Sequence, residues 1–282
     1  MIKANNTIFL FYLAMMDFFG KYLSEKYSQS SSIEDTKHFQ TVIIMKIVQM
    51  FHSLELLSKE TSDETSARCI LRGILDSVTA YSFIYERTDE KDMIFRHYLY
   101  ALDGWRVYKK SVVSILVENE YKYKEDYACD FVIKQIEEKL QSHFYYTQDR
   151  ATAKLLIHNA NWKYESLQNP RRIKYEKMYE HVGFNSNITH YFKGYLSQFS
   201  HGLFFSNKQT SIEILKSVLY ESIILADKFI QAICQTFNDK EMVKQFCSSN
   251  YIQSFLNCKD CDLEDMTGFV CALVRKDKTI LV

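Results

Sequence analysis

Residues 61–87 read TSDETSARCILRGILDSVTAYSFIYER, and this stretch decides the fold. Its large apolar residues recur at intervals of three and four, which is the period of an α-helix with one buried face. Thr61 and Glu64 have the spacing of a capping box, so the helix is expected to begin there and to end near Arg87. The stretch therefore predicts a long amphipathic helix.

The same helical period extends over most of the 282 residues, and the chain contains one proline and seven glycines. Because these are the two strongest helix breakers, their scarcity predicts long helices. We expect an all-α fold, with residues 1–257 forming a single bundle of about nine or ten helices. Residues 258–282 are expected to form a C-terminal tail, in which the sequence from Gly268 onward has the pattern of a short β-hairpin.

Local signals predict where several helices begin. Ser32 follows a polar linker and is expected to cap the second helix. Asn169 and Pro170 have the character of an N-cap and a first-turn proline, which predicts a helix from this point through His181. Residues 121–146 keep the helical pattern throughout and are expected to form one helix.

The charges balance, with 35 basic and 35 acidic residues, so no global field would attract nucleic acid or an anionic membrane. The apolar run Ile8–Phe19 is interrupted by Asp17 and is shorter than the roughly 20 residues needed to span a bilayer. A buried helix without membrane insertion is therefore predicted. The seven cysteines are odd in number, and several lie within apolar helical patterns, which suits a reducing, cytoplasmic location.

Arginine is scarce, with 9 residues against 26 lysines, and five of the nine fall within one stretch. There Arg68, Arg72 and Asp76 lie four residues apart on one side of the predicted helix. A guanidinium offers a rigid fork of donors that suits a carboxylate or another planar anion. The three residues are candidate site residues or, alternatively, an ordinary surface ion pair. If the following helix forms an antiparallel hairpin with this one, Arg96 and His97 would join them as substrate-binding residues.

A second candidate lies in the segment YLSQFSHG at residues 195–202, where His201 precedes a glycine. Histidine can act as a general acid or base because its pKa lies near neutrality. At the end of a helix it can equally bind the last free carbonyl groups as a cap. The sequence leaves both roles open.

The two candidates together resemble an uncharacterised family of prokaryotic all-helical proteins, a domain of unknown function. That family shows an arginine with glutamate one turn later, and then a Leu-Ser-x-x-x-His-Gly-like segment; the resemblance spans residues 40 to 235. Asp76 stands in the place of the glutamate. The matching motifs are Arg68-x-x-x-Arg72-x-x-x-Asp76 and Leu196-Ser197-x-x-x-His201-Gly202.

The family is in turn similar to the HEPN helical bundles of bacterial toxins and antiphage defence systems, which cleave RNA without metal. HEPN ribonucleases place histidine four to six residues after arginine on one helix, and this chain has no such pair. The resemblance therefore implies a composite catalytic site of Arg68, Arg72, Asp76 and His201, with RNA as the partner and no cofactor. His201 would move the proton of the ribose 2′-hydroxyl, and the arginines would hold the scissile phosphate.

Two basic stretches rich in tyrosine could bind RNA through phosphate contacts and base stacking. Lys122 and Lys124 lie in the first, and Arg171 and Arg172 in the second. Acidic residues interrupt both stretches, which is also typical of a solvated helix face whose tyrosines pack inward.

A metal site is not expected, because the only thiolate set with any metal-like spacing fits no common zinc finger. That set is Cys247, Cys258, Cys261 and Cys271. A noncatalytic alternative remains for the whole chain. In it the Arg, Asp and His residues form a structural network, and the protein binds a partner or self-associates as an oligomer.

Overall fold

The computed structural model describes residues 2–28, 33–60, 63–116, 120–184, 186–201 and 212–249. In this part of the chain all regular structure is helical, and the only β-type pairing is an isolated bridge between Tyr164 and Arg172. The all-α prediction is confirmed. The predicted hairpin in residues 258–282 lies outside the described residues.

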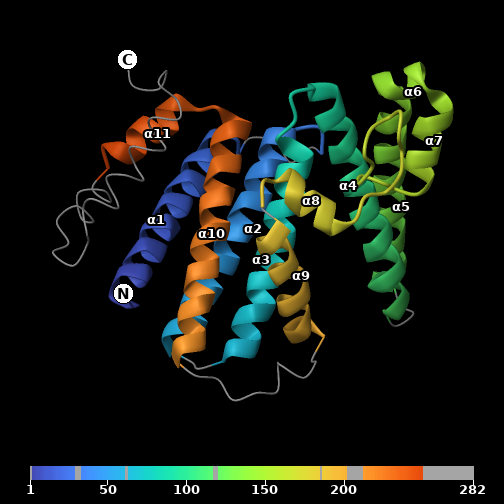
Figure 1. Cartoon of the computed structure of the whole chain (residues 1–282). Coiled ribbons are helices and arrows are strands. Elements are labelled where there is room, and N and C mark those ends of the chain that lie inside the picture. Colours follow the sequence, from blue (N-terminus) through green and yellow to red (C-terminus); the bar gives the residue numbers. More distant parts are fainter. Residues whose placement is uncertain are drawn as a thin grey trace. The chain divides into compact units, whose positions relative to one another are not determined.

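The described chain contains eleven α-helices and one short 3-10 helix, shown in Figure 1. None of these helices is long and apolar enough to cross a membrane. Their bounds are α1 Ile2–Lys26, α2 Thr36–Glu60, α3 Glu64–Tyr85, α4 Glu90–Ser111, η1 Val113–Ile115, α5 Glu120–Ser142, α6 Phe144–Gln148, α7 Arg150–His158, α8 Tyr175–His181, α9 Ser186–Ser200, α10 Ile212–Phe237 and α11 Lys240–Cys247.

The helices group into two compact units. The central unit is Phe83–His181, and the terminal unit combines Met1–Ser82 with Val182–Val282. Helix α3 contributes residues to both units, because the first boundary falls inside it.

In the terminal unit, α1 packs against α2, α10 and α11, and Figure 1 shows α1 and α10 side by side. The apolar run predicted to form a buried helix lies in α1, where Phe9 and Met16 are completely buried. Ile44, Phe51 and other apolar residues of α2 are buried as well. Burial of such side chains stabilises the fold by roughly 1.5–3 kcal/mol each, which explains why this run forms a core helix.

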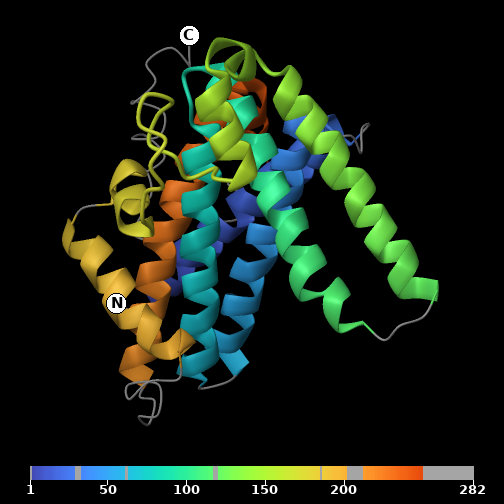
Figure 2. The same cartoon turned by 90° about the vertical axis from the view of Figure 1, so that its right-hand side faces the viewer.

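In the central unit, α4 and α5 pack along each other, and α6 and α7 form a second helix pair. Helix α4 buries five consecutive residues, from Phe95 to Leu99, together with Ala101 and Leu102. Helix α5 buries only Cys129, Ile136 and Leu140, all on one side. Figure 2 shows α4 and α5 as the two long helices of this unit. One face of α5 is therefore solvent-exposed.

Two helix starts differ from the sequence prediction because aspartates provide the caps. Helix α2 begins after Asp35, whose Oδ1 accepts a hydrogen bond of 2.9 Å from the His38 N–H. Ser32, the predicted cap, lies outside the described residues. Helix α3 begins after Asp63, whose Oδ1 accepts from the Ser66 N–H at 3.0 Å. Asp63 carries out the capping predicted for Thr61, because a carboxylate accepts well from these free N–H groups.

The helix predicted to open at Asn169 and Pro170 is wrong, and α8 begins only at Tyr175. The Asn169 N–H donates to Ser166 O at 3.2 Å, which places Asn169 in a turn. The chain after it then pairs with an earlier segment: the Ile173 N–H donates to Lys163 O at 2.8 Å. These backbone groups bind a neighbouring strand-like segment, so they are not available for a helix.

The single helix predicted over residues 121–146 is interrupted at His143, so it forms α5 and α6 instead. Nδ1 of His143 accepts a hydrogen bond of 3.2 Å from the Tyr145 N–H and caps α6. A capping side chain of this kind starts a new helix because it binds an N–H that has no partner within that helix. The hydrophobic period continues through the break, which explains the wrong prediction.

Candidate functional site

Arg68 lies on α3 in the terminal unit, and only 1% of it is exposed. All three nitrogens of its guanidinium donate hydrogen bonds to side chains. Nε donates to Glu64 at 2.6 Å, Nη1 to both oxygens of Glu221 at 3.1 and 3.2 Å, and Nη2 to Ser217 at 2.8 Å. Tyr191 adds a contact of 3.4 Å to Nη1. The network joins α3 to α9 and α10.

Aromatic rings enclose this network. The guanidinium carbon of Arg68 lies 4.6 Å from the ring centre of Tyr195 and 5.1 Å from that of Phe199, both on α9. The Tyr191 hydroxyl also donates to Glu221. Such rings attract a desolvated cation through their negative faces. Groups of the protein itself therefore surround the Arg68 guanidinium and balance its charge.

The electrostatics of this network follow from burial. Burial raises the pKa of Glu221, and the Arg68 charge and the bonds from Tyr191 and Ser217 oppose that rise. Burial would lower the pKa of Arg68, but Glu221 and Glu64 overcome this effect and raise it. The arginine is permanently charged, so it cannot exchange a proton with a substrate.

Arg72 and Asp76 lie further along α3 and are partly exposed, with 18% and 34% of their side chains accessible. Nε of Arg72 donates to Asp76 at 3.1 Å, and its Nη1 donates to the backbone oxygen of Phe192 on α9 at 3.3 Å. The pair thus forms the predicted ion pair one turn apart. It also ties α3 to α9.

His201 lies at the C-terminal end of α9 and is exposed. Its backbone N–H donates to Ser197 O at 3.2 Å, which closes the last turn. Arg72 contacts α9 at Phe192, nine residues earlier, and a helix rises about 1.5 Å per residue. The point at which Arg72 contacts α9 is therefore roughly 13 Å from His201 along the axis of that helix. Arg68, which contacts Phe199, is nearer to His201 but is enclosed.

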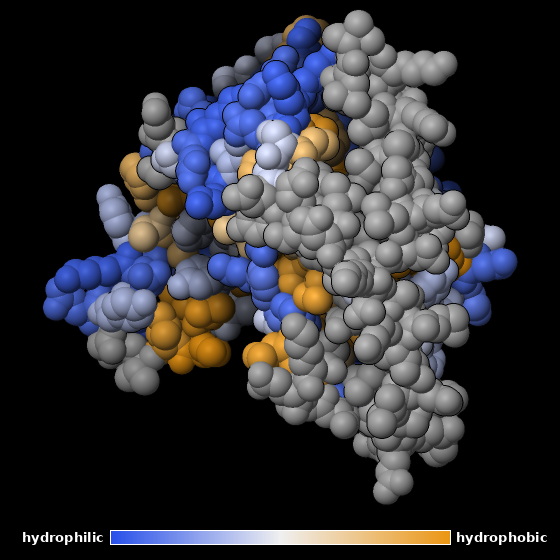
Figure 3. Space-filling view, turned by 90° about the vertical axis from the view of Figure 1, so that its left-hand side faces the viewer, coloured by the Kyte–Doolittle hydropathy of each residue, from blue (hydrophilic) through white to orange (hydrophobic). Residues whose placement is uncertain are grey.

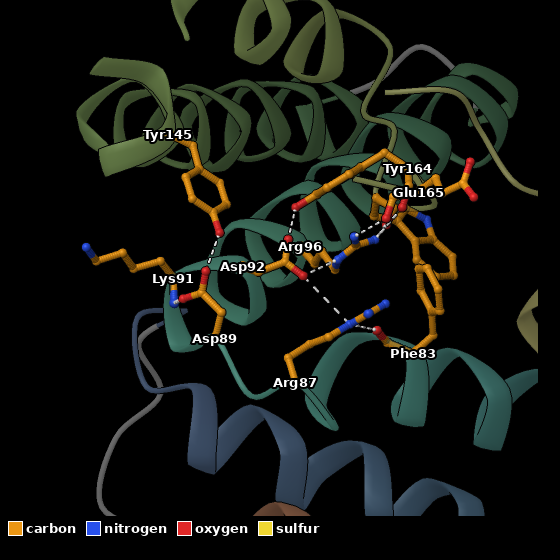
Figure 4. Close-up of polar contacts among 10 residues, drawn as sticks. Phe83, Arg87, Asp89, Lys91, Asp92, Arg96, Tyr145, Tyr164 and Glu165 are labelled. Carbon is orange, nitrogen blue, oxygen red and sulfur yellow. Dashed lines mark hydrogen bonds and ion pairs between the residues drawn. The ribbon is translucent and has the colours of Figure 1, made fainter. Parts of the chain in front are cut away.

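Arg96 belongs to the central unit, where it is buried with 1% exposure. Its Nε donates to Asp92 at 2.8 Å, and Nη1 donates to the backbone oxygens of Trp162 at 3.0 Å and Tyr164 at 2.8 Å. The guanidinium carbon also lies 3.7 Å from the ring centre of Tyr164. Figure 4 shows Arg96 directed at the backbone oxygens of Tyr164 and Glu165. Arg96 therefore clamps the segment that follows α7.

His97, the other predicted substrate-binding residue of α4, is completely buried. Its Nδ1 lies 2.9 Å from the hydroxyl of Tyr85. A fully buried imidazole bound to a tyrosine has no access to solvent. Its contacts are those of a core residue.

A pocket of about 540 Å³ lies beside Arg96 in the central unit. Its charged lining is balanced, with Arg87, Lys91 and Arg96 against Asp89, Asp92 and Glu165. Figure 4 shows Arg87 directed toward Asp92 and the Phe83 carbonyl, and Tyr145 directed toward Asp89. The wall of the pocket is therefore a network of internal ion pairs and hydrogen bonds.

Two charged groups of this pocket, Arg87 and Asp89, have shifted pKa values. Burial and the neighbouring charge of Arg96 lower the pKa of Arg87 to about 10. Its Nη2 is buried and has no hydrogen-bond partner among the described residues. The hydroxyl of Tyr145 donates to Asp89 at 2.6 Å and lowers the pKa of that carboxyl.

The predicted RNA-binding residues lie on the surface of the central unit. Lys124 is exposed on α5 and forms an ion pair of 2.6 Å with Glu120. Lys122, on the same helix, is half-buried. Arg171 and Arg172 are exposed in the segment that precedes α8, and the structure therefore places the two basic stretches on different elements.

The most important residues that the sequence did not reveal are the acidic partners of the buried arginines. Glu64 precedes Arg68 by four residues, and Asp92 precedes Arg96 by four. An acidic residue one turn before an arginine is the signal that could have found both, since side chains at this spacing meet on a helix. Glu221 gives no such signal, because it lies 153 residues from Arg68.

The structure describes one of the four cysteines that have metal-like spacing. Cys247 is a half-buried free thiol, and Cys258, Cys261 and Cys271 lie outside the described residues. Within the described ranges no three His, Cys, Asp or Glu side chains are arranged to hold a metal ion.

Comparison with known proteins found no matching protein family, curated protein or solved structure.

The two buried arginines, Arg68 and Arg96, share one arrangement. Each is paired with an acidic residue one turn earlier on its own helix, and each binds groups far away in the sequence. Such an arrangement fixes how helices and loops pack against each other.

Proposed function

We propose that this chain is a noncatalytic helical interaction module. The observation that carries the proposal is the enclosure of Arg68. A catalytic arginine must direct free donors at the charge that develops on a phosphate, whereas each nitrogen of Arg68 already binds Glu64, Glu221 or Ser217. The network supports the geometry of α3, α9 and α10.

The binding surface of such a module requires large side chains that reach solvent. Helix α5 carries four exposed aromatic residues, with Tyr127 the most accessible at 75%. Tyrosine is enriched at protein interfaces because it supplies large contact area together with a polar tip. In the view of Figure 3, hydrophilic residues cover most of the described surface and hydrophobic ones form separate groups between them. We propose a protein, either a different chain or a second copy, as the partner.

The proposal predicts that Arg68→Ala destabilises the protein. The substitution leaves Glu221 and Glu64 buried without their cation, and breaking a buried ion pair costs about 3–5 kcal/mol. The matched control is Arg171→Ala, at an exposed arginine, which should change the free energy of unfolding by less than about 0.5 kcal/mol. Urea unfolding followed by circular dichroism measures both.

The purified natural protein and both variants should leave total RNA intact, with or without a chelator. Cleavage that purifies with the protein and disappears in Arg68→Ala, while the unfolding transition stays unchanged, would overturn the proposal. That result would mean that the guanidinium acts on a substrate and contributes little to the fold.

The second candidate is the metal-independent ribonuclease of toxin or antiphage systems implied by the HEPN resemblance. The observation in its favour is that His201 is exposed at the end of the helix that contacts Arg72. His201 would take the proton of a ribose 2′-hydroxyl, and Arg72 would bind a phosphate of the same strand. This reading predicts that His201→Ala abolishes RNA cleavage, whereas His158→Ala, at another exposed histidine, does not.

A further inference from the structure

The outer face of α5 presents an aromatic stripe, defined as Tyr123, Tyr127 and Phe131. The three residues are spaced by four, so they form one row on the helix. Their exposed fractions are 65%, 75% and 52%. The buried residues of α5, such as Cys129 and Ile136, lie on the opposite side of the helix, where it packs against α4.

The charges around this stripe are arranged symmetrically about Tyr127. Lys124 lies three residues before Tyr127, and Asp130 lies three residues after it. Glu120 lies seven residues before it, and Lys134 seven residues after. In each of these two pairs of positions, one residue is basic and the other is acidic. All four side chains are exposed, between 62% and 82%.

This symmetry is what a twofold pair of antiparallel helices requires. In such a pair, a residue n positions before the axis faces the residue n positions after it in the other copy, and each contact occurs twice. With the axis at Tyr127, that residue faces its own copy and Tyr123 faces Phe131. Lys124 then faces Asp130, and Glu120 faces Lys134, so both sets of charges are complementary.

The ion pairs that these charged residues form within one chain do not prevent them from pairing with a second copy. Lys124 pairs with Glu120 at 2.6 Å, and Asp130 pairs with Lys109 at 2.6 Å. Exposed pairs of this kind contribute little to stability, so they can rearrange or be shared when a second helix approaches.

We propose that the aromatic stripe of α5 is a self-association surface, whose occupant is α5 of a second copy of this chain. The proposal rests on the proposed function and names its partner. A contact made by one helix per copy lies at the small end of protein interfaces. The dimer is therefore reversible, and its population rises with protein concentration and falls with salt.

The test uses the position that faces itself across the axis. Tyr127→Asp and Tyr127→Lys place two like charges opposite each other, so each variant alone should sediment as a monomer where the natural protein dimerises. A mixture of equal amounts should associate again, because Asp then faces Lys. Tyr220→Asp, at an exposed tyrosine of α10 in the terminal unit, is the control and should dimerise normally.

Sedimentation velocity over increasing protein concentration measures all five samples (the natural protein, the two Tyr127 variants, their mixture and the control), and circular dichroism shows that each is folded. A natural protein that stays monomeric throughout would overturn the proposal, as would a mixture that stays monomeric or single variants that dimerise normally. These results are independent of the RNA and Arg68 experiments. A monomeric protein that neither cleaves RNA nor tolerates Arg68→Ala would remain an interaction module with a different partner.

Discussion

Replacing Arg96 by alanine should destabilise the central unit strongly. The side chain is buried, and it donates to Asp92 and to the backbone oxygens of Trp162 and Tyr164. Arg106 is a matched control, because it also binds two backbone oxygens, of Ile157 and His158, and one carboxylate. The difference is that 33% of the Arg106 side chain is exposed, against 1% for Arg96.

The expected magnitude follows from this difference in burial. A buried polar group left without a partner costs about 1–3 kcal/mol, and Arg96→Ala creates two such carbonyl groups. Asp92 loses its closest cation but keeps the bond from the Tyr164 hydroxyl. We expect a loss of about 4 kcal/mol in the free energy of unfolding of the central unit. For Arg106→Ala water can reach the same groups, so the loss should be about 1 kcal/mol.

Tryptophan fluorescence provides a selective assay, because both tryptophans of the chain, Trp105 and Trp162, lie in the central unit. Urea unfolding followed by fluorescence reports this unit, and circular dichroism reports all helices. Equal destabilisation by Arg96→Ala and Arg106→Ala would refute the reasoning, since the argument depends on the exclusion of water from Arg96. A loss below 1 kcal/mol for Arg96→Ala would refute it as well.

Two further predictions concern the start of α6. Burial lowers the pKa of His143 below its usual 6.5, and its Nδ1 must be unprotonated to accept from Tyr145. The unfolded chain therefore binds this proton more readily, so the stability of the central unit should fall as the pH drops through 6.5. His143→Asn keeps a capping acceptor and should weaken this pH dependence in fluorescence-monitored urea unfolding; an unchanged dependence would contradict the assignment. Tyr145→Phe removes the donor to Asp89 and should lower the free energy of unfolding by about 1 kcal/mol. A thermal unfolding midpoint equal to that of the natural protein would count against this bond.

The features of this structure that depend on residues close together in the chain were predictable from the sequence. The helical period and the scarcity of proline and glycine predicted an all-α fold, and the apolar run Ile8–Phe19 predicted a buried helix. The spacing of Arg72 and Asp76 predicted their ion pair. Each of these features depends on residues within a few turns of one another.

The wrong boundaries also have local causes. Asn169 and Pro170 are compatible with a turn as well as with a helix start, and pairing of the following segment with residues near Tyr164 decides between the two. His143 interrupts a continuous helical pattern because a capping bond competes with the helix. The boundary between the compact units at Phe83 has no linker composition, since it falls inside α3.

The sequence by itself determined which residues share a helix face, because the helical period relates neighbours along the chain. Only the tertiary structure decided that Arg68 is sealed while Arg72 remains partly exposed. Each arginine lies four residues from an acidic residue on the same helix. What distinguishes Arg68 is that Glu221 and Ser217 of α10 bind its guanidinium. Contacts over such separations depend on how helices pack, and a periodicity within one helix carries no information about the helix that covers it.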